Sequence, residues 1–220
     1  MKRVLEYSHS DARRFFLKEE SYFNFDLPKY FVFGNVLQKV SQKLDNKSLS
    51  DFYSTYKEEN SEKCKSCEPC NYDRVNYKLL NNKDGRYAWR PMQLIHPALY
   101  VSLAHIITQE NHWNTIVTRF TDFSKNHNIE CSSLPIEAGD NLSDQAETVS
   151  NWWQLTEQKS IELALDFEYL LHTDIVDCYS SIYTHSIAWA LHTKEEGKKR
   201  KGDKKFIGNL IDKHLQNLTG

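Results

Sequence analysis

The sequence predicts an α+β fold that is rich in helices, and three observations support this. Apolar residues recur at helical spacing through much of the chain. Two apolar-rich segments flank the turn sequence Asn-Asn-Lys-Asp-Gly. Only 7 Gly and 5 Pro occur in 220 residues, which argues against long disordered or fibrous stretches. Aromatic residues make up 13% of the chain, which is enough for a sizeable core.

Helical segments are predicted from the apolar spacing together with capping residues. Ser8 and Ser10 are suitable N-caps for the first helix, Pro97 suits a first helical turn, and Ser143 can cap a later helix. The predicted helices span 11–20, 34–44, 97–107, 112–123, 144–163 and 207–218. Residues 45–70 are expected to form a loop or weak helix, and residues 125–141 to be irregular.

Strands are predicted in two places. Residues 75–80 and 86–95 should form a hairpin, since Asp-Gly accepts the backbone angles that tight turns require. Pro91 should either end regular pairing or place the second strand at an edge. The apolar run 167–175 is better explained as a buried strand than as a helix.

Charge and cysteine content restrict the protein class. The net charge is −2, but residues 194–205 contain six Lys and one Arg against three acidic residues, a local +4. Such a run predicts a mobile solvated loop, with a patch that binds a nucleic-acid backbone as the alternative. The five cysteines, an odd number, and the lack of an apolar signal or membrane segment predict a cytoplasmic protein with no membrane partner.

The residues that indicate chemistry follow the predicted strand, in the sequence Thr-Asp-Ile-Val-Asp-Cys-Tyr at 173–179. An ionised Asp174 at the end of a strand could hold a divalent cation, and the Ile175 carbonyl could add a second hard oxygen ligand. Asp177 and Tyr179 would begin the next turn, close enough to contribute to the same pocket. The alternative is that these aspartates only cap a helix.

The string DIVDCYSSIYTHSI at 174–187 resembles the first palm motif of reverse transcriptases, and the longer LLHTDIVDCYSSIYTHSIAWALH resembles their bacterial defence-associated, abortive-infection branch. Three other segments resemble that branch as well: FDLPKYF at 25–31, YAWRPMQLIHP at 87–97, and NWWQ at 151–154 with EQKS at 157–160. The resemblance implies RNA-directed DNA polymerase activity in anti-phage defence. The fold would be the fingers of a right-hand polymerase with the first part of its palm.

The resemblance implies roles for the residues of the palm motif. Asp174 would be the catalytic metal-binding carboxylate, and the Ile175 carbonyl would bind the metal on the nucleotide side. The Asp177 backbone amide would meet the triphosphate, and Tyr179 would exclude the ribose 2′-hydroxyl. The implied cofactor is Mg²⁺ or Mn²⁺, because two metal ions hold the attacking and leaving oxygens in line during phosphoryl transfer.

The predicted hairpin resembles the fingers hairpin of retroviral reverse transcriptases through its Trp89-Arg90 pair. This implies that Arg90 grips the triphosphate with its fork of donors. Either Lys78 or Lys83 would add a point charge, and the sequence leaves the choice open. The alternative for Arg90 is a surface ion pair on the strand.

The resemblance divides the chain into an N-terminal helical extension (1–70), fingers (71–165), a first palm strand (166–180) and a second fingers segment (181–220). Its implied partners are an RNA template, a DNA product and deoxynucleoside triphosphates, with a non-coding RNA or a C-terminal half of the polymerase as further options. The second fingers segment includes the basic run, so template contact there is also open.

Neither a Pro-Gln-Gly motif nor an Asp-Asp pair occurs in the 220 residues. We therefore expect this chain alone to be inactive. The alternative is a non-catalytic nucleic-acid-binding or interaction module.

Three further signals point more strongly to structure than to chemistry. The Cys64-x-x-Cys67-x-x-Cys70 spacing is tighter than in zinc ribbons, so reduced loop cysteines are favoured and zinc stays an alternative. The five tryptophans are expected in the core rather than stacked on bases. His172 would share a strand face with Asp174, but a packed histidine is favoured over a base.

Overall fold

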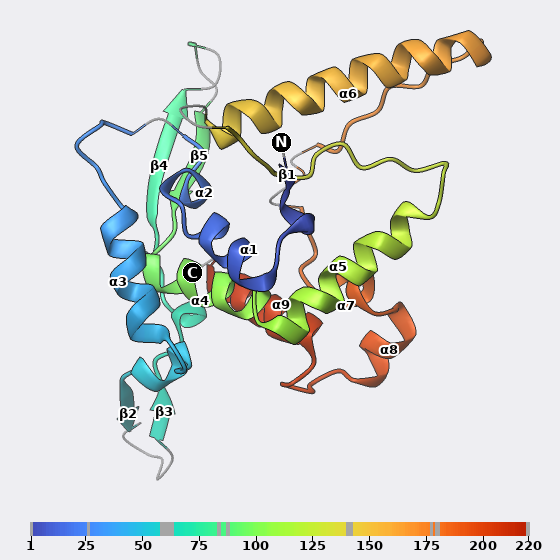
Figure 1. Ribbon diagram of the computed structural model, residues 1–220. Helices are drawn as coiled ribbons and strands as arrows, with labels where there is room; N and C mark the ends of the chain where they lie inside the picture. The colour runs from blue at the N-terminus through green and yellow to red at the C-terminus, as the bar shows by residue number, and fades with distance from the viewer. Residues whose placement is uncertain are drawn as a thin grey trace.

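The protein is a mixed α and β structure in which helices predominate, as predicted. The computed structural model (Figure 1) describes residues 2–25, 27–57, 64–82, 85–86, 89–139, 143–176, 178 and 181–218, with only the backbone at 56, 57, 64 and 65. The helices are α1 (His9–Phe16), α2 (Glu19–Tyr22), α3 (Gly34–Leu44), α4 (Pro97–Ile107), α5 (Glu110–Ser124), α6 (Asp144–Asp166), α7 (Ser186–Leu191), α8 (Lys194–Lys199) and α9 (Ile207–Leu218), with 3-10 turns η1 (Val4–Glu6), η2 (Leu49–Phe52) and η3 (Pro69–Asn71). The strands are β1 (Lys2–Arg3), β2 (Thr55–Lys57), β3 (Cys64–Ser66), β4 (Tyr77–Asn82), β5 (Trp89–Leu94) and β6 (Ile136–Glu137).

The strands form small antiparallel sheets. In the described ranges β1 pairs with β6, β2 with β3, and β4 with β5, so every sheet has two strands. Each strand therefore has an open edge. Strand β6 contacts α6, and Leu94 of β5 packs against the core. Pro91 lies opposite Leu80 in the β4–β5 hairpin, at the edge position predicted for it.

The core is built around the consecutive helices α4 and α5. Leu99 and Val101 of α4 pack with Leu37 and Leu44 of α3 and with Tyr22. A second cluster joins α1 to α5 through buried side chains, which are Val4, Ala12, Phe15 and Trp113. A third cluster joins α5 to α9 through Ile116, Ile207 and Ile211. Through these three clusters, helices from the N-terminal and C-terminal parts of the chain pack on α4 and α5.

Most predicted helices are confirmed within a few residues. Helix α3 has the predicted bounds, and α4 begins at Pro97 as expected. The Ser143 Oγ accepts a hydrogen bond from the Ala146 amide at the start of α6, which confirms the predicted cap. The single helix predicted over 11–20 is instead split into α1 and α2, because the backbone of Lys18 is extended between them.

Helix α6 is long and leaves the body of the protein (Figure 1). Its 23 residues extend for about 34 Å. It contacts β6 and α2, and side chains further along are exposed, including Trp153 at 61% and Leu165 at 84%. In the described ranges no helix combines the length and apolar character that crossing a membrane requires.

The buried strand predicted over 167–175 is wrong. Residues 167–176 form neither helix nor strand, and their apolar side chains face solvent, with Tyr169 exposed to 90%, Leu171 to 86% and Val176 to 89%. A strand requires a neighbour that satisfies its backbone groups. The three described sheets provide no strand to this segment. His172 and Asp174 therefore do not share a strand face.

The solvated loop predicted for the basic run 194–205 is observed only in its second half, where residues 200–205 form neither helix nor strand. Its first half forms α8, whose N-cap Thr193 accepts a hydrogen bond from the Glu196 amide. Gly197 lies directly against Trp189, where a Cβ atom would be 2.7 Å from the ring. The glycine that suggested mobility thus allows close packing of α8 on α7.

Candidate functional site

Asp174 lies in the exposed, irregular segment 167–176. Its Oδ1 accepts a hydrogen bond of 2.8 Å from the amide of the adjacent Ile175, which is a purely local contact. The Ile175 side chain is 67% exposed. Asp177 and Tyr179, the other predicted residues of this string, are outside the described residues. The structure therefore shows one site carboxylate, and within the described ranges its hydrogen bonding is limited to this local contact.

The residues around Asp174 do not form a metal site by themselves. Mg²⁺ prefers six oxygen ligands in a near-octahedral arrangement, several of which can be waters. In the described ranges no three His, Cys, Asp or Glu side chains gather in a way that could hold a metal ion. A single carboxylate with one carbonyl oxygen does not fit the two ions that nucleotidyl transfer requires. Further carboxylates would have to come from another segment or another polypeptide.

The hairpin residues predicted to bind nucleotide lie on opposite faces of the β4–β5 ribbon. Lys78 is paired with Gln93, and Arg90 with Asn81. Cross-strand partners share a face, and successive residues alternate between faces. Lys78 and Arg90 therefore cannot grip one phosphate group from the same side. Lys83, the other predicted lysine, is outside the described residues.

Arg90 is available for an external anion. It is exposed, and no described residue forms an ion pair or hydrogen bond with it. The surface ion pair considered as an alternative for Arg90 is thus not formed within the described ranges. Met92 and Leu94, on the same face of β5, are half-buried, so Arg90 extends the face of the hairpin that is directed toward the core.

A cluster of charges that sequence reasoning missed holds the start of α6. Lys18 Nζ lies 2.5 Å from Glu137 Oε1 and 2.9 Å from Asp144 Oδ2, and the Tyr7 hydroxyl also donates to Glu137. Glu20 accepts hydrogen bonds from the Ser143 hydroxyl and the Asp144 amide. No local pattern could reveal this cluster, because Lys18 is 119 and 126 positions from its two partners.

The pKa values of this cluster reflect the contacts. The hydrogen bond from Lys18, followed by that from Tyr7, holds the pKa of Glu137 below its usual range. Burial, with the Glu137 carboxylate adding to it, raises the pKa of Tyr7 to about 12. Desolvation opposes the charge on Lys18, but the two carboxylates outweigh it and raise the pKa of Lys18. The cluster therefore has one cation, Lys18, against the carboxylates of Glu137, Asp144 and Glu20, and it lines a surface hollow of 760 Å³.

The C-terminal part of the palm-like string contacts α9 through His185. His185 Nδ1 lies 2.5 Å from Asp212 Oδ2, and Asp212 is buried. Gln216 donates a hydrogen bond to the other oxygen of Asp212, at 3.1 Å. The exposed segment with Asp174 therefore lies between the exposed C-terminal end of α6 and this contact of His185.

The cysteine motif has no metal-binding geometry in the described residues. Cys67 and Cys70 are free, and only the backbone of Cys64 is described. Cys70 Sγ lies 3.5 Å from Lys213 Nζ, which itself binds Glu68 Oε2 at 2.7 Å. This ion pair connects η3 to α9. Two described thiols do not test the zinc alternative.

In comparisons with known proteins, no family model matches the chain and no curated protein matches it significantly. The resemblance to reverse transcriptases therefore depends on the sequence strings given above. Function has to be argued from those strings and from the surfaces of this structure.

Proposed function

We propose that the chain is the N-terminal part of an RNA-directed DNA polymerase of the anti-phage defence type, with Asp174 as its first catalytic carboxylate. The observation that carries the proposal is the exposed apolar segment around Asp174. Phe167, Tyr169, Leu170, Leu171, Ile175 and Val176 are all at least 64% exposed. Several large apolar side chains exposed in one segment mark an interaction site on a folded protein.

The palm-like string explains this exposure. In the proposal, residues 166–180 become a palm strand when neighbouring palm strands pair with them, and the apolar side chains are then buried. The neighbouring strands would also supply the missing carboxylates. The His185–Asp212 contact supports this view, since it holds the chain on the C-terminal side of the segment.

Arg90, in the β4–β5 hairpin, also supports the proposal. An exposed guanidinium without a partner on the described residues can meet a triphosphate, for which its planar fork of donors is suited. Lys78 lies on the other face, which leaves Lys83 as the lysine of the pair. Tyr179 would exclude the ribose 2′-hydroxyl. The polymerase would work in the cytoplasm with an RNA template and deoxynucleotides.

The first test is the DNA downstream of codon 220. A Pro-Gln-Gly motif and a paired-Asp motif there, in any frame, are expected. The completed polymerase should extend a DNA primer on an RNA template with Mg²⁺, and Asp174→Ala should abolish extension, whereas Asp166→Ala, at the exposed end of α6, should not. An active Asp174→Ala variant would remove Asp174 from the site.

The sugar preference gives a second test of the same proposal. Tyr179→Ala should increase ribonucleotide incorporation relative to deoxynucleotide incorporation in the completed enzyme. Primer extension above background by the 220-residue chain alone would contradict the view that its site is incomplete.

A non-catalytic nucleic-acid-binding module is the second candidate function. It is favoured by the single described carboxylate at the site and by the folded basic surface of α8. Absence of the two downstream motifs, together with nucleic-acid binding by the chain, would favour this candidate.

A further inference from the structure

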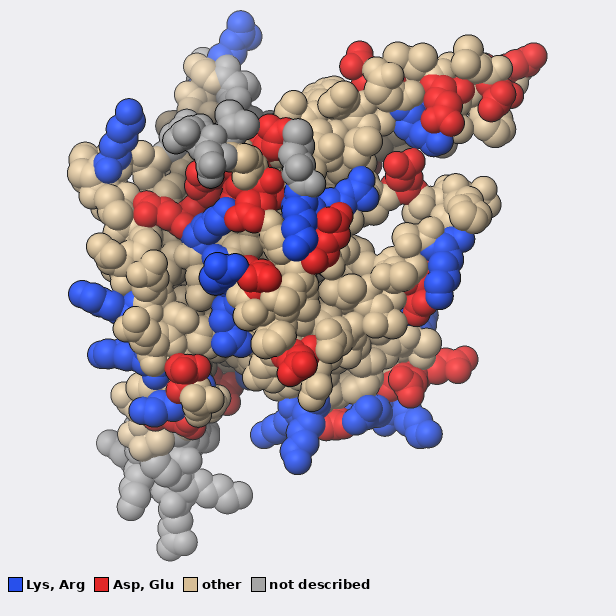
Figure 2. All heavy atoms as spheres, in the orientation of Figure 1, with Lys and Arg blue, Asp and Glu red and all other residues tan. Residues whose placement is uncertain are grey.

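Lysine side chains gather on the surface of α8 and the turn that follows it. Figure 2 shows this concentration of blue atoms at the lower edge of the molecule, below α8 and α9. We call it the α8 surface and define it by the six lysines of this run and one tyrosine, namely Lys194, Lys198, Lys199, Lys201, Lys204, Lys205 and Tyr183. All six lysines are exposed, on a chain whose net charge is −2.

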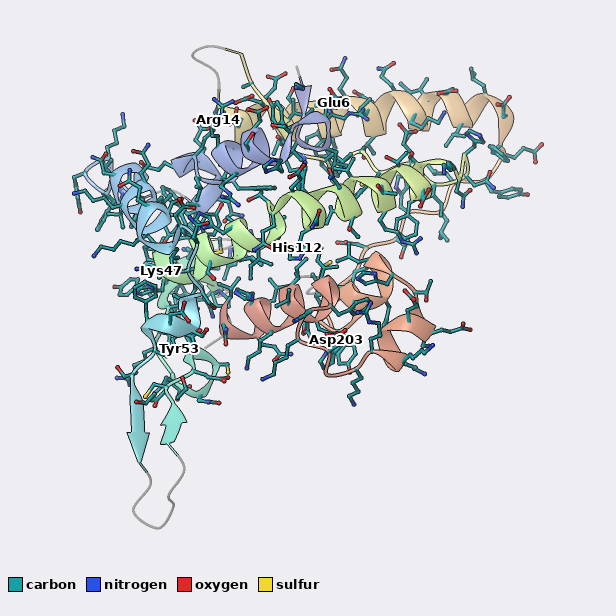
Figure 3. All side chains as sticks on the ribbon, turned by 60° about the horizontal axis from the view of Figure 1, so that its bottom comes forward. Glu6, Arg14, Lys47, Tyr53, His112 and Asp203 are labelled. Carbon is teal, nitrogen blue, oxygen red and sulfur yellow. The ribbon has the colours of Figure 1, made fainter. Side chains whose placement is uncertain are left out.

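The lysines of the α8 surface are not neutralised from within the protein. In the described ranges none of the six forms an ion pair. Asp203, labelled in Figure 3, already accepts two hydrogen bonds from Arg200, at 2.7 and 3.1 Å. Glu195 and Glu196 lie in the first turn of α8, where the helix dipole stabilises negative charge. The positive charge is therefore available to an external anion.

The α8 surface is held by a packed scaffold. The His192 ring stacks on Phe206 with 3.8 Å between centroids, and the Arg200 guanidinium covers Phe206 at 4.3 Å. Asn209 Nδ2 donates hydrogen bonds of 3.0 Å to the carbonyls of Arg200 and Asp203. A scaffold of this kind holds the backbone that carries the lysines, so binding an anion costs less ordering entropy than it would for a loose loop.

An exposed aromatic ring, that of Tyr183, lies beside Trp189, the ring over which Lys194 is placed. Tyr183 is 60% exposed, and its ring centroid lies 5.0 Å from that of His185 and 5.9 Å from that of Trp189. Lys194 Nζ lies 5.5 Å from the centroid of Trp189. Aromatic rings beside a basic surface are the arrangement by which proteins bind single strands, because bases stack on the rings while lysines contact phosphates.

We propose that the α8 surface binds single-stranded nucleic acid, with its lysines on successive phosphates and Tyr183 stacked on a base. A duplex fits less well, because its bases are already stacked on one another. The inference rests on the proposed function for the identity of the partner, which is a nucleic acid. It deepens that function by assigning the binding of the nucleic acid to the α8 surface. It concerns α8 and not the residues around Asp174.

The test is fluorescence anisotropy with the full 220-residue chain and a labelled oligothymidylate of about 20 nucleotides, which is longer than the sites of single-strand-binding folds. EDTA is present and nucleotides are absent. The variant Lys198→Glu/Lys199→Glu/Lys201→Glu should weaken binding at least about tenfold. The slope of log affinity against log salt should fall by about 2, because three phosphate contacts are lost.

The control variant Lys29→Glu/Lys39→Glu/Lys43→Glu changes the net charge equally at three exposed lysines around α3. It should leave the affinity within about twofold if the lysines of α8 bind locally and long-range attraction is screened. Circular dichroism verifies that both variants fold. Equal weakening by the two variants, or no binding of the oligonucleotide by the wild-type chain, would overturn the inference.

Tyr183→Ala tests the single-strand preference. It should weaken oligothymidylate binding about tenfold, the loss of one stacked base, whereas Tyr169→Ala, at a tyrosine 90% exposed outside this surface, should have no effect. Equal affinity for a duplex of the same length, or binding to phosphatidylserine vesicles without binding to the oligonucleotide, contradicts the proposal.

The inference and the proposed function can fail separately. Asp174→Ala should bind the oligonucleotide as the wild type does. Retained binding without polymerase activity in the completed protein contradicts only the proposed function. Primer extension by a completed protein whose α8 surface does not bind single strands contradicts only the inference.

Discussion

Lys78 and Arg90 lie on opposite faces of the β4–β5 hairpin, although the sequence makes them equally good candidates to bind a triphosphate. The register sets this relationship: Lys78 is opposite Gln93, three positions from Arg90 on β5. An odd separation along a strand places two side chains on different faces. The two residues should therefore differ in function.

In the completed polymerase, Arg90→Ala should raise the KM for deoxynucleotides about 10- to 100-fold, the range for loss of charge-assisted hydrogen bonds. Arg90→Lys should also impair binding, because the fork of donors is lost. Lys78→Ala should change the KM less than about twofold, as expected for a lysine that does not contact the nucleotide. Steady-state kinetics measures all three, and equal effects of the two alanine substitutions would refute the assignment.

The Lys18 cluster should stabilise the start of α6. Lys18→Met removes the charge and leaves Glu137 and Asp144 without their cation. We expect a loss of about 1 kcal/mol in the free energy of unfolding, since these side chains are about one-third exposed or less and solvent screens their interaction. Urea unfolding measures this loss. Lys125→Met, which breaks an ion pair with Asp122 between side chains that are 72% and 45% exposed, is the control and should leave the midpoint unchanged.

The same cluster predicts a pH dependence. The pKa of Glu137 is lowered in the folded protein, so its contribution is present above the unfolded glutamate pKa of about 4.3 and is lost as the pH falls through the folded value. Wild-type stability should therefore decrease below pH of about 4.3 more steeply than that of Lys18→Met. Parallel curves of unfolding free energy against pH would show that Lys18 does not shift this carboxyl.

Gly208→Ala should destabilise the contact between α7 and α9. A Cβ atom at Gly208 would lie 2.5 Å from the Ala188 Cα, so the two helices would have to separate. Overpacking of this kind costs about 1–3 kcal/mol. Gly139→Ala is the matched control, because nothing lies within 4 Å of its Cβ position. Thermal unfolding should show a lower midpoint for Gly208→Ala alone.

The exposed segment 167–176 predicts a context-dependent effect. Tyr169→Ser/Leu171→Ser should not lower the stability of the 220-residue chain, because both side chains are at least 86% exposed. In a completed polymerase the same change should reduce stability and activity, since the proposal buries these residues. A large loss of stability in the 220-residue chain would show that the segment is packed.

The secondary structure of this protein was determined largely by local sequence. Helix α3 has the bounds that its apolar spacing predicts, and Ser143 and Pro97 mark the starts of α6 and α4. The β4–β5 hairpin forms where the Asp-Gly turn indicates it. These features follow from interactions between residues that are close in the chain, and such interactions can be recognised in a single sequence.

The tertiary structure decided the features that depend on distant partners. Residues 167–175 have the composition of a buried strand, yet they remain exposed because none of the described sheets provides a strand to pair with them. The basic run has the composition of a loop, yet Trp189 and Phe206 hold it as a folded surface. An apolar segment becomes a strand only if another strand pairs with it, and a charged segment forms a folded surface only if other side chains pack against it. Residues far away in the chain supply these partners.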